Sequence, residues 1–170
     1  MLGFRELCRG RRHVFGQVLV DLGGRVVGFD ALRHPGAVAV LALDERGRVL
    51  VERQYRPAVG GWVLEIPAGT LEPGEEPLEA ARRELLEETG YEASRLCRMA
   101  SFYPSPGVSS EVIHVYLAEG LSYRGQRLEE DEVIEVLWME PRELLERQLE
   151  GVADAKTLIA LLLYMSGRRC

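Results

Sequence analysis

Three glutamates near the end of a predicted helix are the residues of this chain best suited to chemistry. Glu84, Glu87 and Glu88 stand at positions i, i+3 and i+4, so their carboxylates share one helical face. Their Cβ atoms are expected about 5–6 Å apart, and each like-charge pair then costs on the order of 2–3 kcal/mol at an effective dielectric near 20. Arg83 offsets part of this repulsion, but it is a single cation. A divalent cation that prefers oxygen would turn the repulsion into ligation.

The surrounding segment, Gly69–Tyr91, reads GTLEPGEEPLEAARRELLEETGY. It resembles the signature of the Nudix hydrolases, and the matching positions are Gly69, Glu75, Arg83, Glu84, Leu85, Glu87, Glu88 and Gly90. Tyr91 departs from the pattern, which usually has an aliphatic residue there, although an apolar ring can still pack under the helix end. The alternative is a surface helix with a solvated acidic face. Eight fixed positions in one short window favour the Nudix interpretation.

The resemblance implies roles for these residues in metal-dependent hydrolysis. The implied metal ligands are the backbone carbonyl of Ala68 and the carboxylates of Glu84, Glu87 and Glu88. Arg83 would orient the glutamates through Glu87 at i+4, and both count among the predicted catalytic residues. Glu75 supports the loop, ligates the metal, or is an exposed loop acid. Hard carboxylate oxygens favour Mg²⁺, which Mn²⁺ can replace, over zinc.

A second acidic cluster, Glu129–Glu132, precedes a predicted strand. Taken alone, it reads as a solvated loop. Many Nudix hydrolases carry a glutamate in this loop that serves as general base or helps to ligate metal. The resemblance therefore makes Glu132 the first candidate for that role, because it stands just before the strand, and Glu130 the second.

The substrate prediction depends on Pro106, which lies sixteen residues after Gly90. Pro-Gly is an ordinary turn signal in isolation, but a proline at this offset resembles the ADP-ribose pyrophosphatase branch. Segments 54–57, 64–69 and 109–111 resemble that branch too. The expected substrate-binding residues are Arg56, Glu65, Pro106 and Glu111.

The resemblance to this branch implies cleavage of ADP-ribose, a small nucleoside diphosphate derivative, to AMP and ribose 5-phosphate. Two alternatives remain open at this point. One is a pyrophosphatase for a related compound such as GDP-mannose or NADH. The other is a Nudix-fold regulator that binds a nucleotide without hydrolysing it, although the intact set of three glutamates argues against a pure binder.

Short apolar runs and turn signals predict mostly strands, with three helices. The expected strands are 14–22, 25–33, 37–43, 48–56, 62–66, 96–103, 112–118 and 133–139. Helices are expected from Pro77 to Gly90, over 141–149, and from Asp154 as N-cap to about 165. This mixture predicts an α+β class, and the resemblance implies a mixed sheet between helices. Residues 1–35 are expected to form a β-hairpin extension that contributes to a homodimer, and residues 36–170 the Nudix domain.

Composition excludes several other classes of function. The chain of 170 residues has a net charge of −6, which argues against nucleic acid as a partner. It has no apolar run of membrane-spanning length. Its three cysteines are far apart, lack metal-ligand spacing and do not indicate a disulfide framework. A reducing cytoplasm is therefore the expected location.

Overall fold

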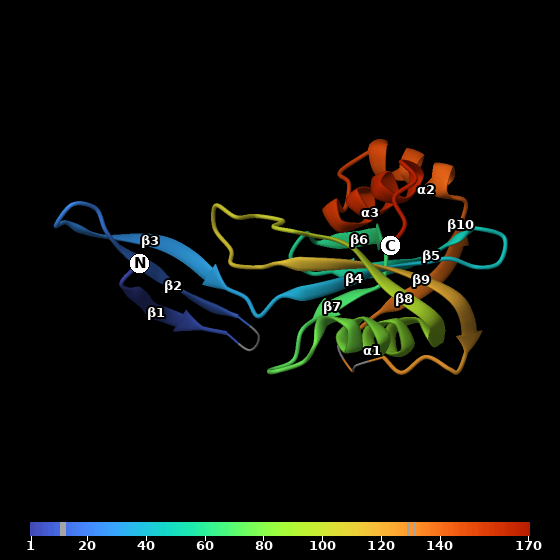
Figure 1. Cartoon of the computed structure of the whole chain (residues 1–170), viewed down its shortest axis with the longest axis horizontal. Helices are drawn as coiled ribbons and strands as arrows, with labels where there is room; N and C mark the ends of the chain where they lie inside the picture. The colour runs from blue at the N-terminus through green and yellow to red at the C-terminus, as the bar shows by residue number, and fades with distance from the viewer. Residues whose placement is uncertain (11–12, 129, 131) are drawn as a thin grey trace.

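The computed structural model describes residues 1–10, 13–128, 130 and 132–170. Its strands form three sheets (Figure 1). The first is antiparallel, in the order β1 (Gly3–Arg9), β2 (Val14–Asp21), β3 (Val26–Arg33). The second is also antiparallel, in the order β10 (Ile134–Met139), β5 (Val49–Arg56), β6 (Gly61–Glu65). The third is mixed, in the order β7 (Ala68–Thr70), β4 (Ala37–Ala42), β9 (Ile113–Tyr123), β8 (Tyr91–Phe102), with β4 and β9 parallel.

Helices cover both sides of the second and third sheets. Helix α1 (Pro77–Thr89) lies on one side, and α2 (Pro141–Leu149) and α3 (Ala155–Met165) lie on the other (Figure 1). All six residues of β4 are buried, as expected for a strand covered on both faces. The predicted α+β class, with a mixed sheet between helices, is confirmed.

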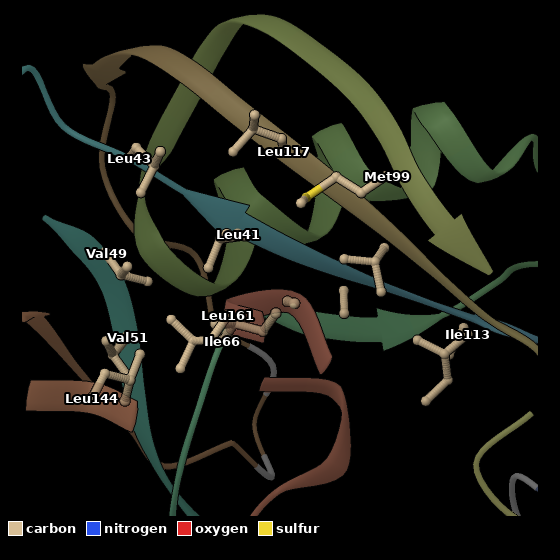
Figure 2. Close-up of a cluster of buried hydrophobic side chains, with 14 residues drawn as sticks. Leu41, Leu43, Val49, Val51, Ile66, Met99, Ile113, Leu117, Leu144 and Leu161 are labelled. Carbon is tan, nitrogen blue, oxygen red and sulfur yellow. The ribbon is translucent and has the colours of Figure 1, made fainter. Parts of the chain in front are cut away.

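The alternation of side chains in β5 separates two hydrophobic clusters. Val49 and Val51 pack in the cluster that contains Leu144 and Leu161, on the side of α2 and α3 (Figure 2). Leu50 packs in the other cluster, with Leu85 of α1. Successive residues of a strand point to opposite faces, so the side chains that follow Leu50 by two and four positions also lie on the α1 side. This face of β5 is therefore the one that can meet the carboxylates of α1.

The predicted ends of α1 and α3 agree with the structure. Pro77 begins α1, and Gly90 ends it with a left-handed φ of 79°. Asp154 caps α3 by accepting a hydrogen bond of 3.0 Å from the Thr157 N–H. Tyr91 follows α1 and packs its ring edge-on against Trp138, with centroids 5.6 Å apart. The aromatic departure from the Nudix pattern is thus accommodated by packing under the helix end.

The N-terminal segment is a three-stranded sheet, so the predicted hairpin is incomplete. Strand β1 was not among the expected strands, because its segment GFRELCR is mostly exposed and three of its seven residues are charged. In Figure 1 this sheet projects from one end of the molecule. Phe4, Val18 and Phe29 are direct cross-strand neighbours and therefore share one face. Phe29 is 50% exposed, so this apolar face is incompletely covered.

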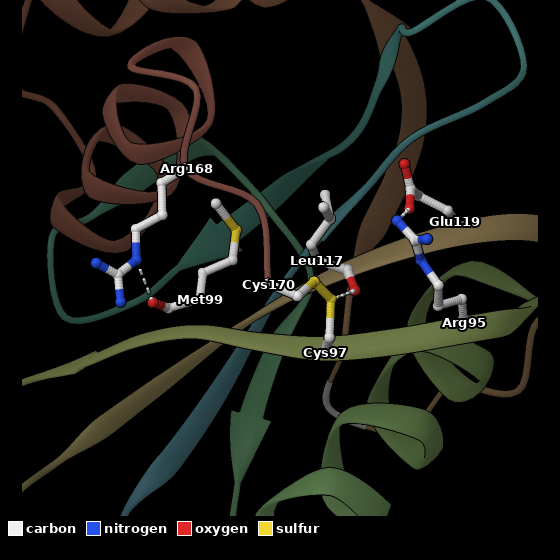
Figure 3. The surroundings of a disulfide bond; sticks show 7 residues. All are labelled: Arg95, Cys97, Met99, Leu117, Glu119, Arg168 and Cys170. Atoms are coloured by element: carbon white, nitrogen blue, oxygen red, sulfur yellow. Dashed lines mark hydrogen bonds and ion pairs between the residues drawn. A yellow bond between two sulfur atoms is a disulfide. The ribbon is translucent and has the colours of Figure 1, made fainter.

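The expectation that the cysteines form no disulfide is wrong, because Cys97 and Cys170 are bonded (Figure 3). Their Cα atoms lie 5.6 Å apart although 73 positions separate them in sequence. After α3 the chain returns along β8, where Arg168 Nε donates a hydrogen bond of 2.8 Å to the Met99 carbonyl. Such proximity depends on tertiary packing and cannot be read from spacing. Among the described residues, no helix is long and apolar enough to span a membrane.

We expect Cys170→Ser to lower the free energy of unfolding by about 2–4 kcal/mol, because the disulfide closes a long loop of the unfolded chain. Denaturant unfolding under oxidising conditions measures this loss. Reductant should destabilise the wild type but leave the variant unchanged. Cys8 is exposed and unbonded, so Cys8→Ser serves as the control. Equal stability of Cys170→Ser and wild type would contradict the prediction.

Candidate active site

Arg83 is the centre of a network of ion pairs formed by α1 and the loop before it. Its guanidinium donates to Glu75 at 2.9 Å, to Glu84 at 2.7 Å and to Glu87 at 3.2 Å. The contact with Glu87 expected from i+4 spacing is therefore present. Glu75 also accepts a hydrogen bond from the Glu72 N–H, and the bond from Arg83 holds the pKa of Glu75 below its usual value. Of the three roles considered for Glu75, these contacts favour support of the loop.

Gly69 allows the loop before α1 to approach Glu84 closely. A Cβ atom at this position would lie 1.9 Å from the carboxylate carbon of Glu84, far inside any tolerated contact. The reason for glycine here is close approach, a standard use of the residue. The first glycine of the motif thus places backbone directly against a candidate metal ligand.

Two of the three motif carboxylates are buried. Glu84 is 8% exposed and Glu88 only 2%. Glu88 accepts a hydrogen bond of 2.8 Å from the N–H of Ala68, so the backbone expected to supply a carbonyl ligand does lie beside it. Burial, and then the charges of Glu52 and Glu84, raise the pKa of Glu88 well above its usual value. Burial also raises the pKa of Glu84 to about 7, against the opposing effect of Arg83.

Glu52 is a further buried carboxylate, and it is not among the predicted site residues. It is 1% exposed and pairs across the strands with Glu65. Burial and the charge of Glu65 raise its pKa to about 8. The available signal was alternation: Glu52 follows Leu50 by two positions in an apolar strand, which places it on a buried face.

A pocket of about 230 Å³ lies next to these carboxylates. Its lining includes Arg56, Ala68, Gly69, Glu111 and Lys156. Pro106 is exposed in a turn outside that lining, where the Val108 N–H donates to the Ser105 carbonyl. The pocket is instead lined by Pro104.

Glu65, the last residue of β6, contacts two cationic residues that line the pocket. Its buried carboxylate accepts a hydrogen bond of 2.8 Å from Arg56 Nε and forms an ion pair with Lys156. Lys156 also contacts Asp154 at 2.9 Å. Lys156 was not among the predicted site residues, although it is the only lysine in the chain. The expected contact residues Arg56, Glu65 and Glu111 are thus gathered at or beside one pocket.

Glu132, one of the two candidate general bases, lies within electrostatic reach of this site. It is half-buried, and its charge acts on Glu52, Glu84 and Glu88. Glu130 is exposed in a turn. The neighbouring Glu129 and Asp131 lie outside the described residues. Position therefore favours Glu132 over Glu130.

The donor set fits a divalent, oxygen-preferring cation. Glu84 and Glu88 are buried together with Glu52, and Glu52 Oε1 has no hydrogen-bond partner in the described part of the chain. Across that same part, no three acidic, histidine or cysteine side chains already converge as a metal site. Arg83 and the Ala68 N–H hold Glu84 and Glu88. Binding would therefore require these carboxylates to exchange part of their present hydrogen bonding for ligation.

A pH titration tests the buried state of Glu84. A carboxyl whose folded pKa is raised gives stability that is present below its unfolded pKa and lost as pH rises through the folded value. In EDTA, the free energy of unfolding of the wild type should therefore fall between pH 4.5 and about 7. Glu84→Gln should remove on the order of 2 kcal/mol of that fall. Denaturant midpoints across this range measure it, with Glu79→Gln, exposed on the same helix, as the control. An unchanged slope in Glu84→Gln would refute the assignment.

Comparisons with known proteins identify the family of this chain. The model of the NUDIX domain matches residues 32–162. The ADP-ribose pyrophosphatase of Bacillus subtilis (strain 168) is 38% identical over 172 residues, 95% of this chain and 93% of its own. The methanol dehydrogenase activator of Bacillus methanolicus is 42% identical over 135 residues, 78% of this chain and 73% of its own. A crystal structure of an ADP compounds hydrolase shares the fold with a TM-score of 0.80 at 22% identity, over 98% of this chain and 91% of its own. This chain belongs to the Nudix family of hydrolases.

Proposed function

We propose that this hydrolase cleaves the pyrophosphate bond of ADP-ribose, giving AMP and ribose 5-phosphate, with Mg²⁺ as its metal and Mn²⁺ as a substitute. The observation that carries this proposal is the position of the pocket, whose lining contains Arg56 and Lys156 and continues through Ala68 and Gly69 to the carboxylates of α1. A diphosphate would fit between the cationic side chains of Arg56 and Lys156 and the proposed metal ligands on α1. The similarity to the Bacillus subtilis ADP-ribose pyrophosphatase over nearly the whole chain supports the choice of substrate.

The bound cation would polarise a phosphoryl oxygen and acidify a water molecule. Glu84, Glu87 and Glu88, with the Ala68 carbonyl, are the residues that would hold it. Arg83 keeps the carboxylates of Glu84 and Glu87 in place through its hydrogen bonds.

The chain's other residues act on the substrate. Arg56 uses Nε to bind Glu65, which orients the guanidinium at the pocket where it can contact phosphate. Glu132 would take the proton of the attacking water, because its charge already acts on the motif carboxylates. The general base then has its own position, separate from the ligands on α1.

Incubation of the purified protein with ADP-ribose should release AMP only when Mg²⁺ or Mn²⁺ is present. Glu88→Gln should lower kcat by about a hundredfold or more, because it removes a proposed metal ligand. Mutation of a residue that only hydrogen-bonds to a metal ligand already costs about 10- to 100-fold. AMP appearance, followed chromatographically, is the measurement. Glu79→Gln, a change of the same kind on the exposed side of α1, should retain wild-type turnover.

Two further variants separate the candidate general bases. Glu132→Gln should lower kcat with little change in KM, and Glu130→Gln should leave both constants unchanged. No AMP from ADP-ribose, with brisk cleavage of GDP-mannose or NADH, would reject the proposed substrate. Turnover that is insensitive to Glu88→Gln would reject the proposed metal-ligand role of Glu88, and no turnover on any of these compounds would favour a nucleotide-binding regulator.

We also propose that the chain forms a homodimer through its N-terminal extension, residues 1–35, with residues 36–170 as the catalytic domain. The sheet of β1–β3 carries Phe4, Val18 and Phe29 side by side on one face. A small antiparallel sheet requires such a face to be covered. A second copy of this chain would cover it symmetrically.

Phe29→Glu should convert the dimer to a monomer at micromolar concentration, because it places a charge on the apolar face. Light scattering coupled to size exclusion measures the mass. Val26→Glu is the matched control, since Val26 is also exposed on β3 but lies three positions from Phe29, on the opposite face. A wild-type protein that is already monomeric would disprove the proposal.

A further inference from the structure

Glu52 and the motif carboxylates come from two elements, β5 and α1, that contribute to the same hydrophobic cluster. The side chain of Glu52 follows Leu50 by two positions, so it lies on the face of β5 that points toward the cluster shared with α1. Glu84 and Glu88 are the buried carboxylates of α1. Buried carboxylates from two separate elements, Glu52 of β5 and Glu88 of α1, thus lie on the side of the fold where these elements share a hydrophobic cluster.

The cations near these carboxylates are engaged elsewhere. Arg56 and Lys156 both bond to Glu65, the cross-strand neighbour of Glu52. Arg83 bonds to Glu84, which precedes Glu88 by one helical turn. Glu52 Oε1 is buried and, within the described residues, has no hydrogen-bond partner. A buried acceptor without a partner is costly, so the arrangement leaves an oxygen free for a ligand.

A second oxygen on the same face of β5 has the same property. Gln54 follows Glu52 by two positions and is 6% exposed. Its Oε1 also lacks a hydrogen-bond partner in the described part of the chain. Carboxylate and amide oxygens are both ligands of hard divalent cations. The two unpartnered oxygens therefore point to a cation, not to an apolar ligand.

We propose that Glu52 is a further ligand of the catalytic cation, so that the metal is held between β5 and α1 by Glu52 and Glu88 together. The inference rests on the proposed metal-dependent hydrolysis but not on the identity of the substrate. It assigns metal binding to a strand outside the Nudix motif. A cation in this position neutralises both buried carboxylates at once, which neither Arg83 nor Lys156 does.

Mn²⁺ binding in the absence of substrate tests the inference. Free Mn²⁺ is counted by electron paramagnetic resonance while the full chain is titrated, for wild type, Glu52→Gln and Glu135→Gln. Glu52→Gln should weaken the tightest site by about tenfold or more. Glu135 is exposed on the neighbouring strand and paired with Arg53, so Glu135→Gln should bind like wild type. Far-UV circular dichroism establishes that each variant is folded.

A crystal of the wild type soaked in Mn²⁺ provides a second measurement that needs no variant. The anomalous peak of the tightest site should lie about 2.0–2.6 Å from a Glu52 oxygen, the range of oxygen ligands to hard cations. Wild-type Mn²⁺ affinity in folded Glu52→Gln, or a Mn²⁺ peak on α1 beyond ligation distance of Glu52, would overturn the inference. Failure of ADP-ribose cleavage alone would not affect either readout, because both are made without substrate.

Discussion

The site depends on a single electrostatic constraint, namely that more carboxylates than cations are buried between α1 and the strands it covers. Glu52, Glu84 and Glu88 are each less than a tenth exposed. Arg83 compensates Glu84 and also serves Glu75 and Glu87, while Glu88 relies on a backbone N–H. Buried charge without a partner is unfavourable. Such an excess of buried carboxylates is relieved when the carboxyls are protonated or when a cation binds between them.

Hydrophobic packing prevents the carboxylates from relieving this constraint by moving apart. Leu50 and Leu85 are fully buried in the cluster that joins β5 to α1. Each stands within three positions of a buried carboxylate, so the backbone on both sides of the site is fixed by packing. Gly69 adds a backbone segment with no room for a side chain between it and Glu84. Packing in the apolar core therefore holds the backbone that carries the polar site in place.

The C-terminal helix connects the pocket to the rest of the fold. Lys156, in the first turn of this helix, forms an ion pair with Glu65. The cap residue Asp154 contacts Lys156 and accepts a hydrogen bond from the Thr157 N–H. Thr157 in turn accepts a hydrogen bond from the Ile66 N–H, directly before the motif. Beyond the helix, the disulfide between Cys97 and Cys170 joins the tail to β8. Pocket, motif loop and C-terminus therefore form one continuous set of contacts.

The sequence by itself determined the elements and chemistry that local rules specify. Spacing along one helix placed Glu84, Glu87 and Glu88 on a common face and paired Arg83 with Glu87, and proline, glycine and Asp154 marked the helix ends. Only the tertiary structure decided what meets across space: Glu52 beside Glu65, Lys156 on Glu65, Pro104 at the pocket, and Cys170 beside Cys97. The physical reason is that helical periodicity and capping act within a few residues. Strand pairing and burial, by contrast, join segments whose separation in sequence carries no information about their distance.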